Sequence, residues 1–307
     1  RNIAWLFAFL AAVCLTAVFG VHRGIERLST CLMPIFFLLM VGLAAYSLLL
    51  PGSEAGLAYL FQFSWSTVTP QAILNAMGFT FFSLSLGAGV LVTYGAYVNK
   101  STRLPSAAMW VAILALQAAI LAGLVIMPAV FAYGLEPDAG PGLVFITLPM
   151  IFAQLSGGSI VAVIFYFCLF VAALTSAISL LEVAVAFLQN ECRFSRRAAV
   201  FLCFAALFIL GSVSALSFGP WNDCLIFGRS IFDFLDYVCT NFLMTINGLA
   251  VAFVVGWKAW PKAMKELSTC SPENGVVTKG TLSAIGFGLR WLAPLMVLAS
   301  CWQGLEA

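Results

Sequence analysis

Apolar residues in this chain come in long runs that are separated by short polar breaks. A helix that crosses a bilayer needs about 20 apolar residues in a row, and the sequence supplies runs of that length repeatedly. We predict eight membrane spans, at about residues 2–21, 31–50, 74–98, 106–132, 157–189, 196–216, 231–256 and 281–302. The predicted fold class is therefore an all-α membrane protein, with residues 1–307 forming a single transmembrane domain.

Composition supports the bilayer as the main solvent. Of the 307 residues, 63% are hydrophobic and 8% are charged, whereas a soluble domain carries roughly 25% charged residues. The formal net charge of +2 leaves no basic surplus to neutralise phosphates, so a nucleic-acid partner is not expected. Membrane lipid is the expected surrounding partner.

The distribution of positive charge predicts the orientation. Cytoplasmic loops of membrane proteins collect Lys and Arg. All the Lys and Arg residues except Arg1 and Arg229 lie in or beside the odd-numbered loops between the predicted spans. We therefore expect a multi-pass protein of the cell (inner) membrane with both ends of this chain on the non-cytoplasmic side.

Residues 134–155 are partly apolar but contain three prolines. Proline interrupts a helix, so this segment is not expected to span the bilayer. We interpret it as a re-entrant or surface helix pair on the extracellular side, where it would form a lid.

The third predicted span carries small and polar residues at its centre, from Ser83 through Ser85 and Gly87 to Gly89. One interpretation is an unwound turn at mid-membrane, which leaves backbone groups free for a cavity or ligand. The other is a small-residue face for close helix packing, which is common in membranes.

The fifth predicted span carries adjacent hydroxyls at Thr175 and Ser176, and the acid Glu182 follows. With the carbonyl of Ala172, the hydroxyls offer neutral oxygens for a small cation, although such hydroxyls commonly bond to their own helix. A carboxylate in a membrane span is costly and should face the protein interior. Glu182 is either part of a functional site or a structural acid. A membrane enzyme built around it is disfavoured, because no second acid or His set accompanies it.

Four ordered motifs carry a resemblance to a known family. They are TFFSLSLGAG at 80–89, VAALTSAISLLEVAVAFL at 171–188, GLVFITLP at 142–149 and HRGIERLSTCLMP at 22–34. The sequence resembles the neurotransmitter:sodium symporter family, whose bacterial members have the LeuT-type fold of two inverted helical repeats. The resemblance implies sodium-coupled symport of amino acids or related amines by alternating access, and no enzymatic activity.

The motifs correspond to the fourth through eleventh helices of the family. We therefore expect an N-terminally truncated chain that lacks the first three helices, with a separate chain carrying those helices as a partner. The alternative is a non-transporting membrane remnant or gene fragment of such a transporter.

The resemblance also implies substrate-binding residues. The carbonyls of Phe82 and Ser83 would bind the substrate amino group near the Ser85 hydroxyl, while Phe82 closes over the substrate. Gly87 and Gly89 would permit unwinding. The implied pocket is lined by Ser176 and Leu180, and it is enlarged at Ala88, where a relative has a large aromatic.

The implied ligands of co-transported sodium are the Ala172 carbonyl and the hydroxyls of Thr175 and Ser176, with Ser83 at another sodium site. The outer-gate acid would be Asp233 or Asp236, between which the sequence does not choose. Residues 107–127 contain no Asn, Asp, Glu, Ser or Thr, so the resemblance carries over no chloride or proton ligand from that span.

Overall fold

The computed structural model describes residues 2–65, 68–99, 102–135, 142–155, 157–269 and 279–306. Regular structure in these residues is helical, apart from one isolated bridge between Ile226 and Arg229. The α-helices are α1 (Asn2–Val18), α2 (Arg27–Leu48), α3 (Ser53–Phe61), α4 (Pro70–Ser83), α5 (Val90–Gly95), α6 (Leu104–Ala132), α7 (Leu148–Gln154), α8 (Gly158–Asn190), α9 (Arg196–Leu216), α10 (Ile231–Tyr237), α11 (Met244–Phe253), α12 (Trp260–Thr269), α13 (Lys279–Phe287) and α14 (Ala293–Glu306). Five π-helical stretches adjoin them: η1 (Val21–Glu26), η3 (Leu143–Thr147), η4 (Val238–Leu243), η5 (Val254–Lys258) and η6 (Gly288–Leu292).

Within the described residues, six helical stretches are long and apolar enough to cross a membrane. They are Gly24–Leu48, Leu104–Ala132, Gly158–Asn190, Arg196–Leu216, Ile231–Lys258 and Leu282–Ala299. Each lies in or overlaps a predicted span. The first predicted span is the shorter helix α1, and the third is divided between α4 and α5. The count of eight therefore stays a prediction.

Two segment boundaries differ from the sequence prediction. The second predicted span begins at 31, but helical structure begins at Val21 and continues through Pro34, which lies inside α2. Of the segment predicted as a helix pair, residues 143–154 form the continuous helical stretch η3–α7. Residues 136–141 lie outside the described residues, and the lid role of the segment stays a prediction.

The helices group into two compact units. Unit 1 contains Arg1–Val18, Ser66–Ala112 and Ser179–Ala307, and unit 2 contains Phe19–Trp65 and Ile113–Ile178. Helices α6 and α8 each contribute residues to both units.

The core of unit 2 is built where four helical segments meet. Val130 from α6 and Leu148 and Ile151 from α7 are almost completely buried, beside Leu43 of α2 and Phe165 of α8. This core is apolar and is stabilised by close packing.

Helix α3 of unit 2 approaches α6 closely at Gly56. A Cβ added at Gly56 would lie 2.6 Å from the Met127 carbonyl oxygen. Only a residue without a side chain therefore fits between the two helices at this point.

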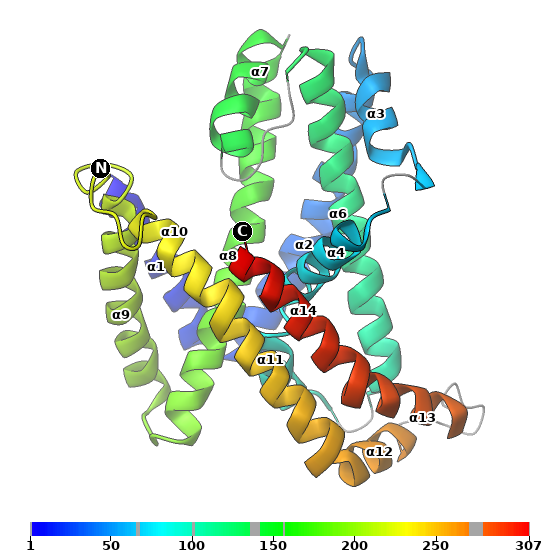
Figure 1. Cartoon of the computed structure of the whole chain (residues 1–307). Coiled ribbons are helices and arrows are strands. Elements are labelled where there is room, and N and C mark those ends of the chain that lie inside the picture. Colours follow the sequence, from blue (N-terminus) through cyan, green and yellow to red (C-terminus); the bar gives the residue numbers. More distant parts are fainter. Residues whose placement is uncertain are drawn as a thin grey trace. The chain divides into compact units, whose positions relative to one another are not determined.

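Unit 1 contains two helix groupings. Helix α1 lies along α9, where Phe7 packs edge-on against Phe204 and Phe208. Helix α14 packs against α4 and α11, as Figure 1 shows. The second grouping includes α4, which ends at Ser83 before α5 begins at Val90.

The close approach at Gly56 gives a test of the unit 2 packing. We expect Gly56→Ala to lower the free energy of unfolding by about 1–3 kcal/mol, since the new methyl group overlaps backbone atoms that have little freedom to move. Thermal unfolding of the purified chain in detergent measures the effect.

The matched control is Gly42→Ala in α2, where an added Cβ meets no atom within 4 Å. That change should be neutral or slightly stabilising, because alanine favours a helix interior over glycine. Equal melting temperatures for the two variants would contradict the described α3–α6 contact.

Candidate functional site

The predicted third span is interrupted between two helices. Helix α4 begins where the Thr69 hydroxyl accepts a hydrogen bond from the Ala72 N–H at 3.1 Å, with Pro70 at the first helical position. It ends at Ser83, and α5 begins only at Val90. We call residues 84–89 the break. The structure shows features of both interpretations of the small-residue stretch. Residues 84–89 form an unwound turn, and Gly87 within it lies close to the backbone of α11 (Met244–Phe253).

The backbone of the break is held in an irregular conformation. Ser85 has φ of 52° and Gly89 has φ of 78°, both in the left-handed region that favours glycine. Such a conformation costs a non-glycine residue about 1 kcal/mol or more. Local hydrogen bonds hold part of it, from the Ser85 N–H to the Phe82 carbonyl at 2.9 Å and from the Ala88 N–H to the Ser85 carbonyl at 3.2 Å.

The break leaves several carbonyls available. In the described part of the chain, four of them accept no backbone hydrogen bond, namely those of Ser83, Leu84, Leu86 and Ala88. A backbone carbonyl without a partner is unfavourable in a bilayer, so it persists only where it lines protein or a water-filled cavity. Carbonyl oxygens are also suitable ligands for an ammonium group or a small cation.

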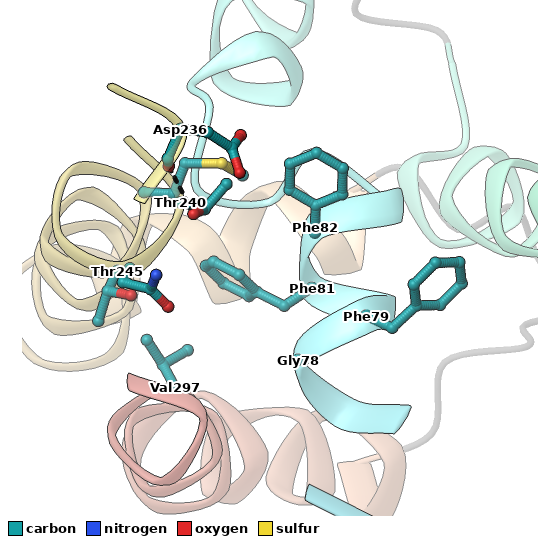
Figure 2. A pocket seen from close by; sticks show the side chains of 10 residues that line it. Gly78, Phe79, Phe81, Phe82, Asp236, Thr240, Thr245 and Val297 are labelled. Carbon is teal, nitrogen blue, oxygen red and sulfur yellow. Dashed lines mark hydrogen bonds between the residues drawn. The ribbon is translucent and has the colours of Figure 1, made fainter. Parts of the chain in front are cut away.

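A cavity of about 350 Å³ lies beside the end of α4, between it and the continuous helix α10–η4–α11. Figure 2 shows Phe81 and Phe82 of α4 and, across from them, Asp236, Thr240 and Thr245. This volume is at the lower end of the range of small-molecule sites, about 300–1,000 Å³. The cavity thus combines aromatic rings with one carboxylate.

The cavity distinguishes between the two acids that the sequence left open. Asp236 lines it together with Phe82. Asp233 instead accepts a hydrogen bond of 2.6 Å from the Ser230 hydroxyl at the start of α10, where Ser230 caps the helix. Asp236 is therefore the acid that the structure brings together with the predicted gate aromatic.

The predicted sodium ligands on α8 lie in the part of that helix that belongs to unit 2. The Thr175 hydroxyl donates within its own helix, to the carbonyls of Val171 at 3.0 Å and Ala172 at 3.1 Å. Its oxygen still has lone pairs that can accept or coordinate. Ser176 is exposed, and so is Leu180 of the predicted pocket.

Glu182 is completely buried and forms an ion pair. Its two carboxylate oxygens accept hydrogen bonds from the Arg196 guanidinium at 2.6 and 3.0 Å, and one of them also accepts from the Tyr97 hydroxyl at 3.2 Å. The pair is bidentate, which is the strongest geometry for such a contact. The structure therefore satisfies this buried acid with side chains from two other segments.

Arg196 connects further elements of unit 1. Its Nε donates to the Ala17 carbonyl near the end of α1 at 2.8 Å, and a terminal nitrogen donates to the Gln189 side chain at 3.2 Å. The sequence prediction placed Arg196 only among cytoplasmic loop charges. The sequence feature that could have indicated this role is Glu182 within an apolar span, because a buried carboxylate requires a cation nearby.

Apolar helices that are interrupted by irregular backbone are common in secondary transporters. The fold of this chain is that of a multi-pass membrane protein with one such interruption. The chain belongs to the Sodium:neurotransmitter symporter family, whose model matches residues 2–283. The family is one of transporters and not of enzymes.

Two curated bacterial relatives and one solved structure agree with this assignment. An uncharacterized sodium-dependent transporter of Haemophilus influenzae is 38% identical over 281 residues, which are 91% of this chain and 60% of the relative. The uncharacterized sodium-dependent transporter YhdH of Bacillus subtilis is 33% identical over 298 residues, 97% of this chain and 65% of the relative. The crystal structure of MhsT in complex with L-phenylalanine superposes with a TM-score of 0.86 at 39% identity, covering 98% of this chain and 68% of MhsT.

The predicted family and its LeuT-type fold are confirmed by these matches. The chain spans less than two thirds of the length of the two curated relatives.

The ion pair between Glu182 and Arg196 can be tested by a double-mutant cycle. Arg196→Gln leaves a buried carboxylate without its cation, and we expect it to lower the free energy of unfolding by roughly 3–5 kcal/mol. Glu182→Gln should cost less, and the double variant should recover part of the loss of Arg196→Gln. Thermal unfolding in detergent measures all three.

Arg197→Gln is the matched control, because Arg197 is the next residue of α9 and is exposed. It should leave the melting temperature unchanged. Additive effects of the two single changes would show that Glu182 and Arg196 do not form a coupled pair.

Proposed function

We propose that this chain functions in sodium-coupled symport, in which sodium moving down its gradient drives an amino acid or related amine across the cell membrane by alternating access. The observation that carries the proposal is the break, with its available carbonyls and the adjoining cavity. Family membership, relatives named as sodium-dependent transporters, and the L-phenylalanine complex of MhsT support it. Sodium is a co-transported ion here and not a resident cofactor.

The substrate ammonium group would bind at the end of α4. The Ser83 carbonyl accepts no backbone hydrogen bond in the described residues. The Phe82 carbonyl accepts from the N–H groups of Ser85 and Leu84, so an ammonium group would compete with these donors for it. The Ser85 hydroxyl lies in the same turn. Bonding an ammonium group to the Ser83 carbonyl would satisfy a backbone group that accepts no backbone hydrogen bond in the described residues.

The outer gate would be formed by Phe82 and Asp236. Both line the cavity beside the break, and the Phe82 ring is exposed. An aromatic ring and a carboxylate at one opening suit a substrate that carries a positive amino group. Asp233 is less suited to this role, because its carboxylate is bonded to Ser230.

The sodium ions would be coordinated by neutral oxygens. One ion would use the Ala172 carbonyl and the hydroxyls of Thr175 and Ser176, and another would use Ser83. Hard cations prefer oxygen ligands, and a hydroxyl that donates within its helix still offers its oxygen to a cation. The surrounding membrane would be a bacterial cell membrane, with the positively charged loops cytoplasmic and residues 134–155 acting as the outer lid.

The proposed sodium site can be tested by binding. Wild-type chain in detergent should bind a radiolabelled amino-acid pool in sodium and not in potassium. The double change Thr175→Ala and Ser176→Ala should abolish this difference, because it removes two oxygen ligands of the proposed ion.

Thr16→Ala is the matched control, since the Thr16 hydroxyl makes the same kind of bond to its own helix, to the Ala12 carbonyl at 3.0 Å. It should bind like wild type. Wild-type binding that is equal in sodium and potassium would contradict the proposal. Absence of any binding would favour the alternative, a non-transporting membrane protein of this family.

The space at Ala88 can be tested by the size of the preferred substrate. Because Ala88 places only a methyl group in the break, leucine and tryptophan should compete for uptake better than glycine or alanine. Ala88→Phe should reverse that order by filling the space. Competition with unlabelled amino acids measures it, and a wild-type preference for glycine or alanine would show that the pocket is not enlarged.

A further inference from the structure

A side chain from another helix reaches the backbone of the break. The amide nitrogen of Asn247, on α11, donates a hydrogen bond of 2.7 Å to the Gly87 carbonyl. The two residues are 160 positions apart in sequence and both belong to unit 1. This is a tertiary contact made directly to the irregular backbone.

The contact is possible because α11 and the break approach each other very closely. A Cβ added at Gly87 would overlap the backbone carbonyl of Met244 in α11, so a larger residue there would separate the break from α11. A Cβ added at Gly248 of α11 would lie 2.5 Å from the ring of Phe81 in α4. Asn247 is half-buried in this contact, within an apolar helix. An amide there is costly unless it is hydrogen-bonded.

The position of Gly87 explains what this bond can do. Gly87 lies between Ser85 and Gly89, the two residues with left-handed backbone. An irregular conformation of this kind persists only when surrounding contacts hold it. The bond from Asn247 holds the Gly87 carbonyl, which lies in the middle of the turn. The carbonyls of Ser83 and Leu84 accept no backbone hydrogen bond in the described residues.

We infer that Asn247 is a positioning residue for the transport site. It fixes the break in one backbone conformation and occupies the Gly87 carbonyl, so that this oxygen is not among those that a cationic substrate could use. The effect of Asn247 on substrate binding rests on the proposed function. The effect of Asn247 on the backbone of the break does not.

The first experiment reads the backbone directly. Hydrogen–deuterium exchange of peptides covering residues 84–92 is compared for wild type and Asn247→Leu, which keeps the size of the side chain and removes its donor. We expect exchange to accelerate about five- to tenfold, the effect of losing one net hydrogen bond. The control is Asn75→Leu, because Asn75 is an exposed residue near the start of α4. It should exchange like wild type.

The second experiment uses Asn247→Asp, titrated in one sample from acidic to alkaline pH. A protonated aspartic acid donates to the Gly87 carbonyl as asparagine does, whereas an ionised one repels it. The apparent KM for L-phenylalanine uptake should therefore match wild type in acid and rise about five- to tenfold above it in alkali. The apparent KM of Asn247→Leu divided by that of wild type should not change with pH, because leucine does not titrate. A purely structural defect would not produce this reversible change.

The outcomes separate the inference from the proposed function. If exchange accelerates in Asn247→Leu but no chain transports, the proposed function fails and the positioning of the break stands. If exchange in the break is unchanged in Asn247→Leu, the inference is overturned whatever the transport activity. A pH profile of Asn247→Asp parallel to that of wild type would also overturn it.

Discussion

A polypeptide inside a bilayer has to satisfy its own backbone hydrogen bonds, and much of this structure follows from how the break meets that requirement. Continuous helices such as α6 and α8 do so internally. The six residues between α4 and α5 do not, and they depend on short turns, on left-handed backbone at Ser85 and Gly89, and on the amide of Asn247. The oxygens that these contacts leave available are the ones that a substrate could use.

A similar requirement holds for buried charge, and the ion pair of Glu182 and Arg196 meets it. A buried carboxylate is stable only with its partner in place, so the pair fixes the relation between α9 and the part of α8 that lies in unit 1. Because Arg196 also bonds to the end of α1, and Tyr97 follows α5, one charged contact joins four segments of unit 1.

Hydropathy predicts the class of protein and most of its long helices, because the length of an apolar run is a local property. The glycines and serines around residue 85 mark the stretch as unusual for a membrane span, but their composition leaves an interruption and a close-packing face as equal interpretations. The partners of these residues are not predictable in the same way. Asn247 is a polar residue within an apolar helix, but neither it nor Arg196 identifies its partner locally, because their roles depend on contacts made after the chain has folded. The choice of Asp236 over Asp233 also requires the helix that carries them, since three residues along α10 decide which carboxylate lines the cavity.

The same ion pair also bears on how the chain enters a membrane as it is made. Glu182 emerges from the ribosome 14 residues before Arg196. At translation rates of about 5–20 residues per second, Arg196 is synthesised roughly one to three seconds after Glu182. Helix α8 therefore carries an uncompensated charge into the translocon only until the start of α9 follows. Insertion of the two helices together, as a hairpin, would bring both charges into the lipid as a neutral pair.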